Sequence, residues 1–336
     1  MLEASERPLV EAYDLVVFDL DGVVYVGDQA VPGAAHHVDR VRRSGAHVAF
    51  VTNNASRTPE AVAGKLTGLG IPTGAGDVVT SAQAAAQLLR ERLGDGAPVA
   101  VLGAEGLRVA VREAGLRPVG VGEEAEAVVT GYGPDVVWSE VMRAASRIRE
   151  GLPWVASNTD LTLPTPEGTA PGHGALVRLL SEFAGVTPEV AGKPAPPLLE
   201  ETVRRVGGSR PLMVGDRLDT DIEGGHRAGV DSLLVLTGVS GLADLAAAGP
   251  AQRPTYLSVD LAGLLEPHPA PAQDERGWSV RGWTASVEGD RLVVEGEGAD
   301  DDWWRAAVPA AWEHLDRTGT PVDTGGVVPP GASPER

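Results

Sequence analysis

The sequence contains no cysteine, which excludes disulfides and thiolate metal sites. Lysine is almost absent too, since Lys65 and Lys193 are the only lysines among 28 basic residues. Long apolar runs are missing, because none approaches the roughly 20 residues that span a bilayer. The N-terminal segment MLEASERPLV is polar and charged, unlike a signal peptide. These absences lead us to expect a soluble, cytoplasmic protein.

Basic charge is scarce as well. The formal net charge is -19, with 47 acidic residues against 28 basic ones. Binding of a nucleic acid or an anionic membrane requires a basic surface, so neither is an expected partner. Hydrophobic residues make up 43% of the 336 residues, enough for sizeable cores, and this length predicts two or three domains.

Short β-branched runs alternate with helix-period segments over residues 14–265, which predicts α/β domains with parallel strands. The apolar spacing from Val137 to Ile148 predicts a helix, and Thr58 and Ser81 are the expected starts of two others. The expected strands cover residues 14–18, 47–52, 98–102, 126–130, 153–157, 211–214 and 231–236.

The last part of the chain differs in composition. Residues 267–276, rich in proline and alanine, indicate a linker. Five of the seven tryptophans follow it, and residues 277–325 predict a small β-β-α module with a hairpin turn around 288–290. Its helix would place Trp304, Val308, Trp312 and Leu315 on one face despite Pro309. Residues 326–336 are expected to be disordered.

Two carboxylates follow the first apolar run. LVVF leads into Asp19 and Asp21, and residues i and i+2 of a strand point to the same face. Ligands bind beyond the carboxyl ends of parallel strands, where paired carboxylates suit a hard cation such as Mg²⁺. A simple turn through Gly22 is an equally open alternative.

Polar residues also follow two later segments. Thr52-Asn53-Asn54 ends the second strand and offers donors for a phosphoryl oxygen, with a capped turn as the alternative. Lys193 lies between Gly192 and Pro194, ahead of a helix expected near 197–207. Its ammonium group suits a phosphoryl charge, with a solvated surface lysine as the alternative.

A third acidic segment, GDRLDTD, follows the strand at 211–214. Asp216 is placed to complete a cation site. Asp219 and Asp221 are both placed to cap the next helix, and for Asp219 the cap is the preferred interpretation.

Taken in order, Asp-x-Asp-Gly, Thr-Asn-Asn, Gly-Lys-Pro and Gly-Asp-x4-Asp resemble the four motifs of the haloacid dehalogenase (HAD) superfamily of phosphatases. LDGVVY, FVTNNAS, VAGKP and VGDRLDTDI are similar to subfamily IIA, the 4-nitrophenylphosphatase-like branch. The resemblance spans roughly residues 12–265. It implies a Rossmann-like core with a parallel sheet over 1–78 and 187–266, and an inserted α/β cap domain for substrate specificity over 79–186.

The resemblance also implies catalytic roles. Asp19 would be the nucleophile that forms an aspartyl-phosphate, and Asp21 would protonate the leaving group and then deprotonate water. Thr52 and Asn53 would hold the phosphoryl oxygens. Lys193 would balance charge between the nucleophile and the phosphate.

A Mg²⁺ cofactor is implied by the same motifs. Its expected ligands are Asp19, the backbone carbonyl of Asp21, and Asp216, with Asp221 as an outer or water-mediated partner.

Two polar loops of the implied cap, Asn158-Thr159-Asp160 and Gly172-His173-Gly174, are candidates to face the substrate. His173 and Asn54 are the expected substrate contacts, with a helix-capping or surface role as the alternative for His173. Members of this branch act on small phosphomonoesters, and the arginine-rich composition and tryptophan-bearing tail resemble actinobacterial members. Glycerol 3-phosphate is therefore the expected substrate, with phosphoglycolate, pyridoxal phosphate or a nucleotide monophosphate as alternatives.

Two further alternatives stay open. The clustered tryptophans indicate packing onto the core or onto a second subunit, so a homodimer is one expected form. A non-catalytic phospho-ligand binding or assembly protein is the alternative to an enzyme.

Overall fold

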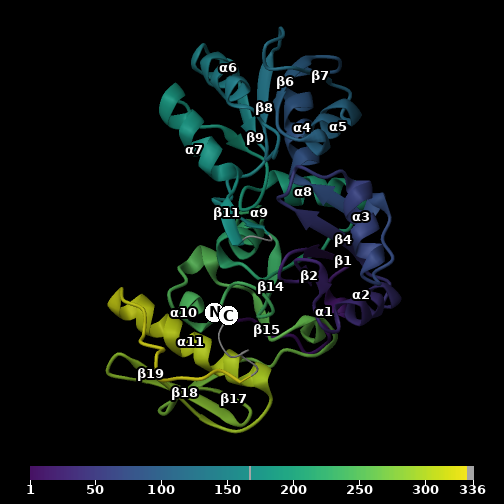
Figure 1. Cartoon of the computed structure of the whole chain (residues 1–336). Helices are drawn as coiled ribbons and strands as arrows, with labels where there is room; N and C mark the ends of the chain where they lie inside the picture. The colour runs from purple at the N-terminus through teal and green to yellow at the C-terminus, as the bar shows by residue number, and fades with distance from the viewer. Residues whose placement is uncertain (166–167, 331–336) are drawn as a thin grey trace. The chain divides into compact units, whose positions relative to one another are not determined.

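The structure is a computed structural model that describes residues 1–165 and 168–330. The chain, traced from end to end in Figure 1, forms two compact units, one made of Met1–Val48 with Gly208–Arg336 and the other of Ala49–Gly207. The domain boundaries predicted at 78/79 and 186/187 stay predictions. Within the described ranges, every helix is too short or too polar to cross a membrane.

The first unit contains parallel strands in the order β15-β14-β13-β1. Their apolar runs are buried on both faces, as expected for a parallel sheet covered by helices. The strands are β1 (Leu15–Asp19), β13 (Pro211–Gly215), β14 (Asp231–Val235) and β15 (Tyr256–Ser258). The first three lie within one residue of the predicted ranges, which confirms the α/β class, whereas β15 is too short to give a periodic signal.

Short helices and turns complete this part of the first unit. They are α1 (Leu9–Ala12), α2 (Ala34–Arg43), η2 (Leu218–Ile222), α9 (Glu223–Ala228), α10 (Leu242–Ala246), η3 (Pro250–Gln252) and η4 (Leu261–Leu265). A two-stranded hairpin, β2 (Tyr25–Val26) with β3 (Gln29–Ala30), follows the first motif.

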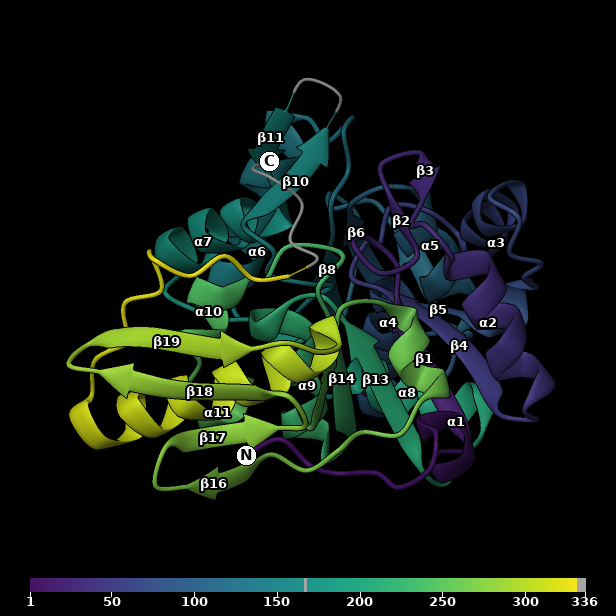
Figure 2. The same cartoon turned by 90° about the horizontal axis from the view of Figure 1, so that it is seen from below.

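The C-terminal part of the first unit is an antiparallel sheet with a helix on one face (Figure 2). Its elements are β16 (Ala272–Asp274), β17 (Gly277–Val280), β18 (Trp283–Glu288), β19 (Arg291–Gly296) and α11 (Asp300–Thr318). The predicted hairpin turn and the helix through Pro309 are confirmed. The sheet has two strands more than expected, because β16 and β17 are short and most of their side chains are exposed or half-buried.

The tryptophans of α11 pack inside this unit. Trp303, Trp304 and Trp312 are buried in one cluster with Leu234 and Leu245 of the sheet region. The indole Nε1 of Trp312 donates to the backbone carbonyl of Leu245 at 2.8 Å. Packing onto the core therefore accounts for these tryptophans, and the homodimer stays a prediction. Of the segment predicted to be disordered, residues 331–336 lie outside the described residues.

The second unit opens with the end of β4 (His47–Thr52), which pairs in parallel with β5 (Val78–Thr80). Between them lie α3 (Pro59–Gly68) and the turn η1 (Ala75–Asp77). Thr58 caps α3 as predicted, because its hydroxyl accepts from the Ala61 amide. The next helix is capped by Thr80 rather than by Ser81, since Thr80 and Gln83 form a reciprocal capping box.

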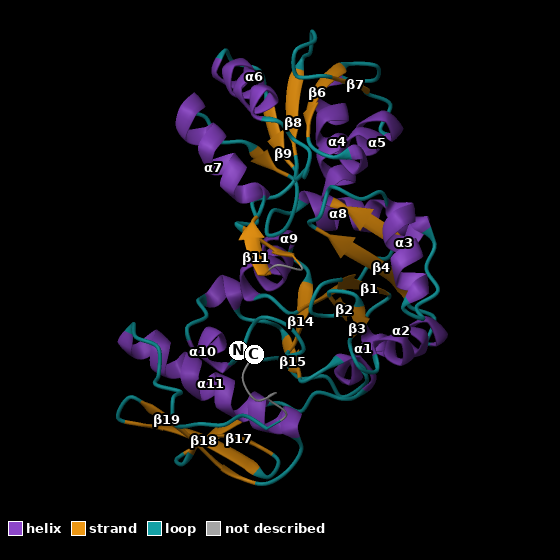
Figure 3. Cartoon of the chain, in the orientation of Figure 1, coloured by secondary structure: helices purple, strands orange, loops and turns teal. Residues whose placement is uncertain are grey.

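A five-stranded parallel sheet, ordered β12-β9-β8-β6-β7, forms the rest of the second unit. Figure 3 shows α6 and α7 on one side of its strands and α4 and α5 on the other. The strands are β6 (Pro98–Leu102), β7 (Arg117–Val119), β8 (Ala127–Thr130), β9 (Trp154–Ala156) and β12 (Glu189–Val190). The helices are α4 (Ser81–Leu93), α5 (Glu105–Glu113), α6 (Trp138–Arg149), α7 (His173–Ala184) and α8 (Pro197–Val206), and a β10 (Thr162–Thr165) and β11 (Gly168–Pro171) pair precedes α7.

Candidate functional site

Three carboxylates come together in the first unit. Asp19 ends β1, Asp216 directly follows β13, and Asp221 lies in η2; each offers an oxygen, and these three oxygens lie within 4.8 Å of one another. Asp216 and Asp221 are 0% exposed. Buried like charges this close are costly unless a cation balances them, and an all-oxygen donor set suits a hard divalent cation. The residues present therefore fit Mg²⁺, and Asp221 lies in the same group as Asp19 and Asp216.

Glycines allow the carboxylates to approach. A Cβ added to Gly22, whose φ is +85°, would lie 2.4 Å from Oδ2 of Asp216, and a Cβ on Gly215 would lie 2.1 Å from Cβ of Asp221. Real Cβ atoms do not come this close to other heavy atoms, so glycine is required at both positions. The sequence indicated Gly22 as a turn residue, and the structure adds its contact with Asp216.

Asp21 occupies the turn after β1. The turn is closed by hydrogen bonds from the Gly22 amide to the Tyr25 carbonyl at 2.8 Å and from the Val24 amide to the Leu20 carbonyl at 2.9 Å. Asp21 is exposed, and in the described part of the chain its carboxylate is not a member of the three-oxygen group. Its side chain is thus left for a role other than direct grouping with Asp19 and Asp216.

The predicted cap at Asp219 is wrong. Its carboxylate accepts from the guanidinium of Arg217 at 2.8 and 3.0 Å. Partial burial acts to raise the pKa of Asp219, but the hydrogen bonds and charge of Arg217 lower it overall. The backbone amide of Arg217, directly before η2, donates instead to Oδ2 of Asp221 at 3.1 Å. The carboxylate at the start of η2 is therefore that of the buried Asp221 and not that of the exposed Asp219.

In the second unit, Asn53 clamps the backbone of Lys193. Its Oδ1 accepts from the Lys193 amide at 2.9 Å, and its Nδ2 donates to the Lys193 carbonyl at 2.9 Å and to Oδ1 of Asp160 at 3.1 Å. Lys193 is 2% exposed, so the surface-lysine alternative is wrong. A Cβ on Gly192 would lie 2.6 Å from Oδ1 of Asn53, which explains the glycine before the lysine.

The polar residues after β4 also form a turn. The buried hydroxyl of Thr52 accepts from the Asn54 amide at 3.1 Å, and Oδ1 of Asn54 accepts from the amide and hydroxyl of Ser56 at 2.9 and 2.6 Å. The capped-turn alternative therefore holds for Asn54. A contact between Asn54 and substrate stays a prediction.

His173 joins this network through Asn158. It is 3% exposed at the start of α7, and its Nδ1 lies 2.9 Å from the Asn158 carbonyl, which can only accept, so Nδ1 carries the proton. Burial lowers the pKa of His173 to about 4, so the ring is neutral near pH 7. The surface alternative is wrong, and a substrate contact stays a prediction.

The side chain of Asn158 carries the network on to Asn53. Its Nδ2 donates to the Asn53 carbonyl at 2.7 Å, and its Oδ1 accepts from the Asp160 amide at 3.1 Å. The hydroxyl of Ser81 donates to the same Asn53 carbonyl at 2.7 Å. Asp160 belongs to a loop that was predicted to face the substrate, whereas Ser81 was predicted only as the start of a helix. A polar residue opening a helix directly after the short β5 was the available signal for Ser81.

Comparison with known proteins agrees with the four motifs. Residues 16–117 match a family model described as haloacid dehalogenase-like hydrolase, and residues 190–264 match a second, HAD-hydrolase-like model. A D-glycerol 3-phosphate phosphatase of Mycobacterium tuberculosis is 42% identical over 320 residues, which cover 91% of this chain and 88% of the relative.

Two solved structures are similar over most of their length. The glycerol phosphate phosphatase of Mycobacterium tuberculosis in complex with magnesium gives a TM-score of 0.84 at 42% identity, covering 91% of this chain and 92% of that one. A 4-nitrophenylphosphatase from Thermotoga maritima gives 0.71 at 28% identity, covering 76% and 98%. The motifs, the parallel sheets and these relatives together show that the chain belongs to the haloacid dehalogenase-like hydrolases.

Proposed function

We propose that this protein is a Mg²⁺-dependent phosphomonoesterase that hydrolyses a small phosphorylated metabolite through an aspartyl-phosphate on Asp19. The observation that carries the proposal is the group of three carboxylates, Asp19, Asp216 and Asp221, two of them fully buried, in a member of a family whose similar relatives are phosphatases. Asp19 ends a buried strand and is held in place by the sheet, as a nucleophile requires.

Asp19 and Asp21 would divide the chemistry. A carboxylate oxygen of Asp19 attacks phosphorus and forms a P–O bond, while the ester P–O bond breaks and Asp21 gives its proton to the leaving alkoxide. Water then attacks the phosphoryl group, Asp21 takes the proton, and the carboxylate of Asp19 is released with inorganic phosphate. An acid that donates a proton cannot also be an ionised cation ligand, which agrees with the place of Asp21 outside the carboxylate group.

The carboxylates of Asp19, Asp216 and Asp221, with the backbone carbonyl of Asp21, would hold Mg²⁺. When bound, the ion would neutralise negative charge on the phosphoryl oxygens.

Thr52, Asn53 and Lys193 would bind the phosphoryl oxygens of the same substrate. Both N–H groups of the Asn53 side chain are already used, by Asp160 and by the Lys193 carbonyl. Asn53 would therefore contribute its backbone amide to the phosphate and use its side chain to position Lys193. The ammonium of Lys193 would offset charge between Asp19 and the phosphate.

Glycerol 3-phosphate is the substrate we propose. The support is the 42% identity with the D-glycerol 3-phosphate phosphatase over 91% of this chain. Asn54 and His173 are the proposed substrate contacts, and the neutral His173 would offer Nε2 as an acceptor for a substrate hydroxyl.

Phosphate release from a panel of phosphomonoesters with Mg²⁺ tests the proposal. The panel contains glycerol 3-phosphate, phosphoglycolate, pyridoxal phosphate, nucleotide monophosphates and 4-nitrophenyl phosphate. Asp19→Asn should lower kcat by at least roughly 10³-fold with an unchanged melting temperature. Asp219→Asn removes an exposed carboxylate of the nearby acidic segment and should retain activity. Equal turnover by Asp19→Asn would refute the mechanism, and tight binding without phosphate release would favour a binding protein.

A further inference from the structure

The segment Thr237-Gly238-Val239-Ser240 begins two residues after the end of β14. It therefore lies just past the carboxyl end of its strand, where Asp19 ends β1 and Asp216 follows β13. We call it the β14 loop, and we propose that it is a positioning element of the cation site. Its backbone would hold the carboxylate of Asp216, and the hydroxyl of Thr237 would hold the turn that presents the Asp21 carbonyl. The proposal rests on the proposed function.

The first observation is that the β14 loop binds Asp216 through both its side-chain carboxylate and its backbone carbonyl. The amide of Val239 donates to Oδ2 of Asp216 at 2.7 Å, and the amide of Ser240 donates to the backbone carbonyl of Asp216 at 3.1 Å. The Val239 side chain is 70% exposed, so this residue acts through its backbone rather than through packing. A carboxylate held by a backbone amide keeps one orientation, which fixes the position of both its oxygens.

The second observation is steric. A Cβ on Gly238 would lie 1.9 Å from Oδ2 of Asp216, and a Cβ on Gly22 would lie 2.4 Å from the same oxygen. The carboxylate therefore lies between two backbone segments that are far apart in the sequence. Neither segment tolerates a side chain at that point.

The third observation joins these two segments directly. The hydroxyl of Thr237 donates to the backbone carbonyl of Gly22 at 2.6 Å, and the Gly22 amide donates to the Tyr25 carbonyl at 2.8 Å. Both the amide and the carbonyl of Gly22 are thus hydrogen-bonded. The Gly22 amide and the Asp21 carbonyl belong to the same peptide group, so these bonds also fix the direction of the Asp21 carbonyl. Thr237 would in this way set the direction of a proposed ligand that it does not touch.

The β14 loop also reaches the third acid. The hydroxyl of Ser240 accepts from the Leu218 amide at 3.2 Å, at the start of η2, which contains Asp221. One short loop therefore contacts the segments that carry Asp21, Asp216 and Asp221. Ordinary loop packing would predict no effect of this loop on metal affinity, whereas a positioning role does.

The test uses the full-length protein and Thr237→Val, which removes the hydroxyl at nearly constant volume. Mn²⁺ binding to the metal-free protein is measured by electron paramagnetic resonance, with kcat and the Mg²⁺ requirement for 4-nitrophenyl phosphate as second readouts. Mn²⁺ affinity should fall about 10-fold, and the Mg²⁺ concentration that gives half-maximal activity should rise by a similar factor. Thr237→Ser, which restores the hydroxyl, should recover most of the loss.

Thr318→Val is the matched control, because Thr318 also donates a hydroxyl hydrogen bond to a backbone carbonyl, that of His314, but in the last turn of α11. It should bind Mn²⁺ as the wild type does. If Thr237→Val does not fold, Gly238→Ala replaces it and should also lose Mn²⁺ affinity.

Wild-type Mn²⁺ affinity in Thr237→Val, or in Gly238→Ala if that variant replaces it, would overturn the inference while leaving the phosphatase proposal intact. A wild-type protein that neither binds Mn²⁺ nor releases phosphate would overturn both.

Discussion

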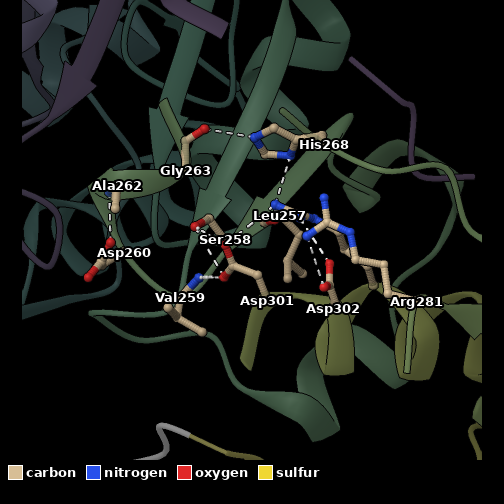
Figure 4. A network of polar contacts seen from close by, with 11 residues as sticks. Leu257, Ser258, Val259, Asp260, Ala262, Gly263, His268, Arg281, Asp301 and Asp302 are labelled. Carbon is tan, nitrogen blue, oxygen red and sulfur yellow. Dashed lines mark hydrogen bonds and ion pairs between the residues drawn. The ribbon is translucent and has the colours of Figure 1, made fainter. Parts of the chain in front are cut away.

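The guanidinium of Arg305 donates from Nε and Nη2 to the backbone carbonyl of Leu257, at 3.2 and 3.1 Å. Leu257 belongs to β15, the edge strand of the sheet with the order β15-β14-β13-β1. Asp301 accepts from the Val259 amide at 2.7 Å and from the Ser258 hydroxyl, as Figure 4 shows. The first turns of α11 therefore satisfy backbone groups at this edge strand and connect the C-terminal part of the first unit to the parallel strands of the same unit.

Arg305→Met should destabilise the protein strongly. The guanidinium is buried, and its removal leaves the Leu257 carbonyl, Asp301 and Asp302 without a buried partner that they now have. Loss of one member of a buried charge network costs about 3–5 kcal/mol in unfolding free energy. Urea unfolding of the variant and the wild type would measure this difference. Arg276→Met is the control, because its pair with Asp274 is exposed and should be worth less than about 1 kcal/mol. Equal stability of Arg305→Met and wild type would contradict this account.

Stability should decrease as the pH falls from about 6.5 to about 4. Burial lowers the pKa of His268 to about 4, helped by the charge of Arg305, and burial lowers the pKa of His173 to about 4. Each folded-state pKa is below the ordinary value, so the unfolded chain binds more protons and acid favours unfolding. Between pH 7 and pH 5 the loss should be roughly 2 kcal/mol per histidine.

Urea unfolding at the two pH values measures this loss. His268→Asn keeps an oxygen that can accept from Arg305 but cannot titrate, so it should show a smaller pH dependence than the wild type. The same pH dependence in both proteins would exclude His268 as a source of the effect.

Gly22→Ala should abolish most of the proposed hydrolysis. The new Cβ would lie 2.4 Å from Oδ2 of Asp216, at a φ of +85°, so the carboxylate has to move. We expect a loss of about 100-fold in kcat or more, because misplaced catalytic groups lose this much rate. Gly27→Ala has the same kind of backbone strain, with φ of +58°, but nothing within 4 Å of its Cβ.

The pair separates steric displacement from backbone strain. Gly27→Ala should lose about 1 kcal/mol of stability and keep its activity. If both variants lose activity equally, strain in this segment, and not contact with Asp216, is the cause.

The two lysines of the chain provide a matched comparison. Lys193→Met removes a buried ammonium whose backbone is clamped by Asn53, and it should lower kcat/KM by about 10²-fold or more. Lys65→Met removes the other lysine, in the last turn of α3, and should leave kcat/KM unchanged. Steady-state kinetics with 4-nitrophenyl phosphate measures both. Full activity of Lys193→Met would remove this residue from the proposed phosphate site.

The longer buried strands and the order of the motifs could be predicted from the sequence. The ranges 47–52 and 98–102 match β4 and β6, because a parallel strand buried on both faces is an apolar β-branched run that is visible without knowledge of its neighbours. Asp19 and Asp216 could be selected for the same reason, since each ends such a run. Local signals also placed α3 and its cap at Thr58.

Which of the acidic side chains lie together depends on the tertiary structure. Asp219 and Asp221 are equivalent in the local sequence. In the structure, however, Asp219 pairs with Arg217, whereas Asp221 lies with Asp19 and Asp216. The contact of Thr237 with Gly22 joins positions 215 residues apart, and no periodicity encodes it. Chain connectivity fixes only what lies within a few residues, whereas close approach of distant backbones depends on how the strands are ordered in the sheet, and that order is settled by packing.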